Sequence, residues 1–343
     1  MNRRLPFSPF LLAVWLLFLP AALRAQTLTE PTYAEKLGWP KGSRVVIMHI
    51  DDAGMSYDSN LGTIQALEKG VATSVSVMMP CPWVPGFVRY LKEHPGVDAG
   101  LHLTLTAEWK DYRWGPLTGT AAKGLVDPEG ALWRDVAGVV QHATPDEVEA
   151  EIRAQLARAQ SMGFAPTHLD SHMGTLFASP AFLERYLKLG IETGIPVMFP
   201  GGHNTLIAQQ MGSGSEPLQQ ARLVGKKLWD AGLPVLDDLH NGTYGWNLPA
   251  GTPYAPGKTK SFKTERYIGA LKTLQPGVTM IIMHCTAPTE VFKYISDSGA
   301  SREGDLLAML DPALRQAIKD QKIILTTWRE LKERRVKAAQ AQK

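Results

Sequence analysis

Histidines and aspartates occur together at several places in this 343-residue chain. The residues concerned are His49, Asp51 and Asp52, then His102, then His168, Asp170 and His172, and finally His284. Imidazoles and carboxylates bind the divalent cations used in hydrolysis, and they also act as general acids and bases. The chain therefore carries the side chains of a metal-dependent hydrolase, if the fold brings them together.

Asp51 and Asp52 end an apolar segment and are followed by Ala-Gly. Two adjacent carboxylates disfavour joint ionisation unless a cation or hydrogen-bond donors compensate. Neighbouring side chains of an extended chain point in opposite directions, so we expect the two aspartates to have different roles. Taken alone, such a pair is also typical of a helix cap.

The segment His-Leu-Asp-Ser-His at 168–172 is more specific. In a strand, residues 168, 170 and 172 face one way, so Asp170 can orient one of the two imidazoles by accepting its ring N–H. His102 stands in an apolar segment and needs a hydrogen bond or a metal. One aspartate and two histidines form a common open site for a hydrolytic cation. The alternative is that these polar groups satisfy one another without a metal.

The elements that must position these residues alternate between short β-branched runs and longer helical patterns. Strands are expected at residues 44–50, 74–79, 97–103, 167–171, 195–199, 234–236, 278–283 and 322–326. Helices are expected at 57–69, 84–93, 144–162, 180–189, 217–229, 262–274 and 302–319, followed by a polar terminal helix. About eight such units predict an α/β fold with a single domain, a (β/α) barrel that is TIM-like or distorted. The carboxyl ends of all strands open onto one face of a barrel, so the histidines and aspartates can converge there.

Residues 1–25 predict a secretory signal peptide, and residues 26–343 form the expected barrel domain. Arg3 and Arg4 give a basic start, residues 10–19 are apolar, and Ala25 ends a small-residue cleavage site. The apolar run is shorter than the roughly 20 residues of a membrane-spanning helix, which argues against a stable membrane anchor. We therefore expect a periplasmic or secreted protein, and the sequence does not choose between the two.

The formal charge of +3 equals the contribution of Arg3, Arg4 and Arg24, so the chain without its leader is formally neutral. This balance gives no electrostatic footprint for nucleic acid. Cys81 and Cys285 allow one disulfide or two buried free thiols, and we favour free thiols. Whether the chain forms a homodimer is left open.

Four segments resemble, in order, the signatures of the YdjC-like carbohydrate deacetylases. They are His-Ile-Asp-Asp-Ala-Gly at 49–54, Gly-Leu-His-Leu at 100–103, Pro-Thr-His-Leu-Asp-Ser-His at 166–172 and Met-His-Cys at 283–285. The resemblance spans residues 44–330 and implies an α/β barrel that holds a divalent metal, Zn or Mg, and removes acetyl groups from N-acetylated sugars or oligosaccharides. It implies Asp52, His102 and His172 as metal ligands, Asp51 as general base and His284 as general acid.

The chain departs from the family pattern at two of these segments. Ala53 stands where the family usually has an aromatic residue, and Met173 follows the third signature where further histidines are common. Aromatic residues in the loops after the third and sixth expected strands would stack on sugar rings or hold those loops in place. They are Trp109, Tyr112, Trp114, Trp133, Tyr244 and Trp246. The alternatives to a deacetylase are a metallohydrolase acting on another ester or amide bond and a non-catalytic secreted carbohydrate-binding protein.

Overall fold

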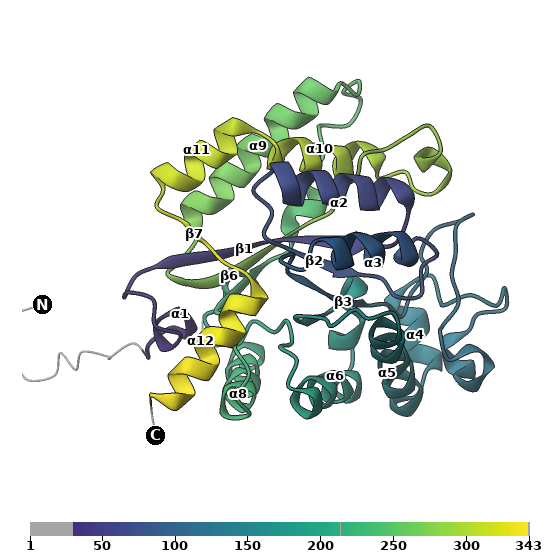
Figure 1. Cartoon of the computed structure of the whole chain (residues 1–343), viewed down its shortest axis with the longest axis horizontal. Helices are drawn as coiled ribbons and strands as arrows, with labels where there is room; N and C mark the ends of the chain where they lie inside the picture. Colours follow the sequence, from purple (N-terminus) through teal and green to yellow (C-terminus); the bar gives the residue numbers. More distant parts are fainter. Residues whose placement is uncertain (1–29, 213, 342–343) are drawn as a thin grey trace, which may run out of the picture. The chain divides into compact units, whose positions relative to one another are not determined.

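Seven parallel strands form one curled sheet in the computed structural model, which describes residues 30–212 and 214–341 (Figure 1). The strands are β1 (Arg44–Ala53), β2 (Ser74–Val77), β3 (Ala99–Leu103), β4 (Leu169–Ser171), β5 (Asp238–His240), β6 (Gly277–Met283) and β7 (Ile324–Leu325). Their order is β4-β3-β2-β1-β6-β5, and β7 pairs with β1. From Pro31 onward the chain forms one unit, which agrees with the single barrel domain expected from the sequence.

The central strand β1 is buried along nearly its whole length, because helices cover the outside of the sheet. It pairs with β6 in parallel from Arg44 opposite Gly277 to Ile50 opposite Met283. A strand that is covered on both faces has a nearly continuous apolar sequence, as residues 44–50 and 278–283 do. The carboxyl ends of these strands carry the acidic and histidine residues.

The sheet closes only loosely between β4 and β5. Isolated parallel bridges join Leu169 to Val197 and Pro200 to Leu236, so the segment between them crosses the gap without a regular ladder. The strands expected at 195–199 and 234–236 were therefore wrong as strands, and β5 begins at Asp238, after the second of these segments has ended. Prolines without an N–H stand in both segments and interrupt strand pairing. The result is a distorted (β/α) barrel, in agreement with the expected fold class.

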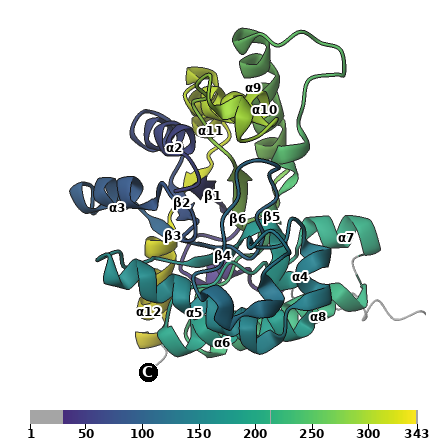
Figure 2. The same ribbon diagram turned by 90° about the vertical axis from the view of Figure 1, so that its right-hand side faces the viewer.

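Helices surround the curled sheet in the view of Figure 2. They are α1 (Tyr33–Lys36), α2 (Tyr57–Lys69), α3 (Val84–Glu93), α4 (Val136–His142), α5 (Pro145–Ser161), α6 (Pro180–Thr193), α7 (Thr205–Met211), α8 (Glu216–Asp230), α9 (Pro256–Thr273), α10 (Gly299–Met309), α11 (Pro312–Asp320) and α12 (Trp328–Gln340). The bounds of α2 and α3 are those expected. The helix expected over 302–319 is two helices, because Pro312 cannot continue α10 and instead opens α11 behind the N-cap Asp311.

The remaining sequence expectations concern targeting and thiols. The signal peptide expected at residues 1–25 lies outside the described residues. Within the described part of the chain, no helix combines the length and apolar character needed to cross a membrane. Cys81 and Cys285 are both buried and free, as we favoured.

Candidate active site

Three side chains from three strand ends converge on one point. Asp52 lies near the end of β1, His102 lies in β3, and His172 directly follows β4. The Asp52 Oδ1 atom is 3.4 Å from His102 Nε2 and 3.4 Å from His172 Nδ1, and the two ring nitrogens are 3.2 Å apart. The structure thus brings together the three residues that the resemblance implies as metal ligands.

Each of the two imidazoles has a carboxylate behind it. His102 Nδ1 donates to Asp170 Oδ1 at 2.6 Å, and His172 Nε2 donates to Glu108 Oε2 at 3.1 Å. When each imidazole is neutral and gives its N–H to that carboxylate, its other ring nitrogen carries a lone pair that points to the space beside Asp52. This arrangement fixes the tautomer and raises the basicity of a metal-binding histidine.

The two carboxylate oxygens of Asp52 have different partners: Oδ2 pairs with the Arg302 guanidinium, and Oδ1 faces His102 and His172. Arg302 Nη1 donates to Asp52 Oδ2 at 2.6 Å, and both side chains are buried. Burial raises the pKa of Asp52, but Arg302 and the two histidines outweigh burial and hold that pKa well below its usual range. The Oδ1 atom has no aligned hydrogen-bond donor among the described residues. A buried anionic oxygen without a donor is a natural ligand for a cation.

The donor set fits a divalent metal. Donor atoms on a tetrahedral zinc ion, with bonds of about 2.0–2.2 Å, lie about 3.3–3.6 Å apart. The observed separations of 3.2–3.4 Å among Asp52, His102 and His172 are close to that range. Burial lowers the pKa of His172, but Glu108 and Asp52 raise it to about 9, so a cation bound here would displace a proton. Two imidazoles and one carboxylate suit zinc or another first-row ion better than magnesium.

Asp51 and Asp52 line the same cavity, which differs from the sequence expectation of opposite directions. Asp52 has a φ of 68°, in the left-handed region that aspartate tolerates better than most residues, and the pairing of β1 with β2 shifts register between Ile50 and Ala53. The strand periodicity therefore ends before Asp52. The alternative role as a helix cap does not apply, because Ser56 caps α2.

His284 follows β6 and faces Asp51. The His284 Nε2 atom lies 3.9 Å from Asp51 Oδ2, and the Tyr244 ring meets the imidazole edge to face at 5.0 Å. Burial lowers the pKa of His284, and the balance between Asp52, which raises it, and Arg302, which lowers it, leaves that pKa below its usual value. Both expected catalytic residues thus stand within reach of one reacting centre.

The backbone of His284 is held by a buried polar cluster. Its N–H donates to Asp305 Oδ2 at 3.2 Å. The other oxygen of Asp305 accepts from Tyr267 at 2.8 Å and pairs with Lys263 at 2.9 Å, and these side chains are fully buried. This cluster ties α9 and α10 to the end of β6, so it fixes the place of the imidazole.

A cavity of about 420 Å³ lies over these groups. Part of its wall is apolar and is made by Phe177, Met198, Leu239 and Ile282. Of the aromatic residues expected to contact sugar, Trp109 and Tyr244 line the cavity, and both rings lie over the Arg302 guanidinium at 5.7 and 5.6 Å. The other four do not line it and pack in or against the hydrophobic core; they are Tyr112, Trp114, Trp133 and Trp246.

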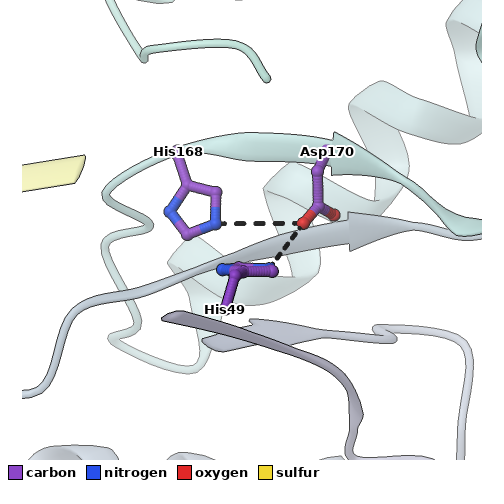
Figure 3. Close-up of side chains that lie close together, drawn as sticks. All are labelled: His49, His168 and Asp170. Carbon is purple, nitrogen blue, oxygen red and sulfur yellow. Dashed lines mark hydrogen bonds and ion pairs between the residues drawn. The ribbon is translucent and has the colours of Figure 1, made fainter. Parts of the chain in front are cut away.

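The 168–172 segment departs from the expected single face. β4 ends at Ser171, so His172 belongs to a tight turn and not to the strand. His168 does not reach the cluster of Asp52, His102 and His172: it packs beside His49, and its Nε2 lies 3.9 Å from Asp170 (Figure 3). Asp170 does orient an imidazole, but that imidazole belongs to His102.

Sequence reasoning missed Arg302 and Glu108. Arg302 lies inside a helical pattern with no motif around it, so nothing separated it from a surface arginine. Glu108 had a weak signal, since it lies in the long loop that follows His102. Arg302 contacts Asp52, and Glu108 contacts His172, and each partner is distant in the sequence.

We expect the substitution Arg302→Met to weaken metal binding. Without the guanidinium, Asp52 Oδ2 loses its donor at 2.6 Å and the carboxylate is free to turn. Loss of such a supporting partner costs about 10–100-fold in metal affinity. Calorimetric titration of the metal-free protein with zinc measures the effect. Arg335→Met is the matched control, since Arg335 is also buried but bonds to the Trp229 carbonyl. Equal zinc affinity in both variants would contradict this role.

The His49–Asp170 pair makes the stability of the metal-free protein depend on pH. Burial lowers the pKa of His49, but Asp170 and Asp51 raise it from 6.5 to about 9. The stabilisation is therefore complete below pH 6.5 and is lost as the pH rises through 9. Urea unfolding in the presence of a chelator should show that the difference in unfolding free energy between the unmodified chain and His49→Gln shrinks from pH 6.5 to pH 9.5. A constant difference would contradict the pairing.

The fold and the site together define a distorted (β/α) barrel with a buried Asp–His–His cluster at the carboxyl ends of its strands. The family model described as YdjC-like protein matches residues 45–320. The chain therefore belongs to the YdjC-like family.

Individual relatives agree with this assignment. A protein of Thermus thermophilus named carbohydrate deacetylase is 30% identical over 301 residues, which cover 87% of this chain and 97% of that protein. A chitooligosaccharide deacetylase of Yersinia enterocolitica is 32% identical over 133 residues, which cover 38% of this chain and 49% of that protein. The crystal structure of an Enterococcus faecalis protein assigned to cellobiose-phosphate cleavage shares the fold, with a TM-score of 0.67, 20% identity, and coverage of 84% of this chain and 99% of that one.

Proposed function

We propose that the chain is a metal-dependent hydrolase that removes acetyl groups from N-acetylated sugars or oligosaccharides. The observation that carries this proposal is the convergence of Asp52, His102 and His172 in one cavity with Asp51 and His284. The names of the YdjC-like relatives support a carbohydrate amide as the substrate. The Asp–His–His donor set supports a divalent metal as the cofactor; the family resemblance permits Zn or Mg, and the donor set favours zinc.

Asp51 and His284 have separate roles in the proposed reaction. A bound divalent ion would polarise the acetamide carbonyl and lower the pKa of the attacking water. Asp51 would accept the proton of that water through Oδ2, the oxygen that faces His102 Nε2 at 3.7 Å and His284 Nε2 at 3.9 Å. His284 would donate a proton to the departing amine. Each proton transfer contributes about 10²–10⁴ in rate.

The cavity suits a sugar that carries an amide. Trp109 and Tyr244 offer aromatic surface near the charged groups, and aromatic side chains supply large apolar contact area. The apolar wall around Phe177 and Ile282 would receive the less polar part of the substrate.

The decisive experiment measures acetate release by the purified protein from a panel of N-acetylated and O-acetylated sugars, before and after removal of metal by a chelator. We expect acetate from N-acetylated oligosaccharides, loss of activity on chelation, and recovery on adding zinc or magnesium. Acetate from the O-acetylated sugars alone would point to an esterase. Sugar binding without turnover would point to a carbohydrate-binding protein.

The proposed location is the periplasm or the exterior of the cell, on the basis of the signal-peptide pattern in residues 1–25. Cell fractionation followed by sequencing of the mature amino terminus tests it. We expect the exported chain to begin after Ala25, and a full-length chain retained in the cytoplasm would contradict export.

A further inference from the structure

A second buried group of titratable side chains lies beside the metal-ligand cluster. His49 of β1 and His168 both face the carboxylate of Asp170 in β4, as Figure 3 shows. The side chains of all three are at most 2% exposed. The proposed mechanism assigns no role to His49.

This second group differs from the metal-ligand cluster in its spacing. His49 Nε2 lies 2.9 Å from Asp170 Oδ2, which is a hydrogen-bond length, whereas His168 Nε2 lies 3.9 Å from the same oxygen. Donor atoms that share a tetrahedral ion lie about 3.3–3.6 Å apart. The group is also closed to solvent, which leaves no open position for water. A hydrogen-bonded network accounts for it better than a second metal.

His49 presents one ring nitrogen to two carboxylates. Its Nε2 donates to Asp170 Oδ2 at 2.9 Å and lies 3.2 Å from Asp51 Oδ1, while its Nδ1 contacts the Ser74 hydroxyl at 3.1 Å. The contact with Asp51 is an ion pair and not an aligned hydrogen bond, because Asp51 Oδ1 has no bonded donor among the described residues. The other oxygen of Asp51, Oδ2, lies 3.7 Å from His102 Nε2 and 3.9 Å from His284 Nε2.

The second carboxylate acts on the metal-ligand cluster. Asp170 uses Oδ2 for His49 and Oδ1 for His102, whose Nδ1 donates to it at 2.6 Å. Each oxygen of the Asp170 carboxylate thus accepts a hydrogen bond from a different imidazole. A shift of His49 would turn Asp170 and, with it, the imidazole that faces Asp52.

We propose that His49 is a positioning residue that holds Asp51 and Asp170 in place through one ring nitrogen. Because Asp170 orients His102, one buried imidazole aligns both the proposed general base and a proposed metal-binding imidazole. The inference rests on the proposed function and adds to it a residue that touches neither substrate nor metal.

The test compares His49→Leu and His49→Gln with the same two substitutions at His168. His168 is the matched control, because it is as fully buried as His49 and its ring packs beside the His49 ring. Unlike His49, it stacks on Trp328 at 5.2 Å and has no close contact with Asp51. The readouts are kcat and KM for acetate release, and the affinity of the metal-free protein for zinc by calorimetry.

We expect His49→Leu to lower kcat by about 100-fold, with KM changed by less than about threefold, and to weaken zinc binding by about 10-fold. Glutamine keeps an N–H donor near the position of Nε2, so His49→Gln should recover about half of the loss in log kcat. The His168 variants should keep kcat and zinc affinity within about fivefold.

Equal losses at His49 and His168, or a kcat of His49→Leu within about threefold of the unmodified chain, would overturn the proposal. If circular dichroism shows that His49→Leu does not fold, the same comparison is made between His49→Gln and His168→Gln, with about a 10-fold loss of kcat expected only at His49. If the unmodified chain releases no acetate, the proposed function fails. The difference in zinc affinity between the two sites then still decides the positioning role.

Discussion

Replacing His172 with alanine should remove tight metal binding and lower acetate release by more than the roughly 100-fold expected when only a supporting partner of a ligand is lost. His172 Nδ1 is one of three converging donor atoms, at 3.4 Å from Asp52 Oδ1 and 3.2 Å from His102 Nε2. Two remaining donors fall short of the three protein ligands of a typical catalytic zinc site. Metal content per chain and acetate release by the same preparation measure the two effects.

The control for this variant is His94→Ala. His94 is a partly exposed histidine that stacks on Tyr90 at the end of α3, so its loss should change neither metal content nor activity. Unchanged metal content and acetate release in His172→Ala would remove His172 from the site. Loss of activity with metal content unchanged would assign it a role other than that of a ligand.

The sequence predicts the scaffold well where local chemistry decides it. The apolar runs of β1 and β6 and the capping box at Thr144, which the structure confirms, depend on residues a few positions apart. The elements that failed depend on pairing: the segment around Val197 has the composition of a strand, but the prolines on either side leave it with single bridges. Composition alone does not show whether a partner strand is within reach.

The sequence predicts which residues form the site, but not the directions in which their side chains point. Strand periodicity placed His168 on the same face as His172, but β4 ends at Ser171 and the turn after it redirects the chain. In the same way, the positive φ of Asp52 brings it to the side of Asp51. The first error applies the strand period one residue beyond β4, and the second applies it across a residue of positive φ near the end of β1.

Residues that act through space were the hardest to find. Arg302 comes from α10, far from Asp52 in sequence, and α10 packs beside α2, which follows Asp52 in the chain. Its burial is offset by the ion pair and by two aromatic rings. No local pattern encodes such a contact, so a single sequence does not reveal it.

The substitution Asp51→Asn should lower kcat by about 10²–10⁴-fold and leave metal content unchanged. The carboxamide has the shape of the carboxylate but cannot accept a proton from water at neutral pH. The donor atoms of Asp52, His102 and His172 are not altered, and His49 still has an oxygen at 3.2 Å to contact. Steady-state kinetics at saturating zinc, together with metal analysis, give the two readouts.

The adjacent substitution Asp52→Asn supplies the contrast that separates a base from a ligand. A neutral carboxamide binds a cation more weakly than a carboxylate, so this variant should lose zinc affinity and regain activity as zinc is added. Asp51→Asn should not respond to added zinc, because its deficit lies in proton transfer. The two changes are isosteric, one residue apart and lie in the same cavity, so general disruption would affect both alike. If added zinc restored both variants equally, Asp51 would be a ligand and the base would have to be sought elsewhere.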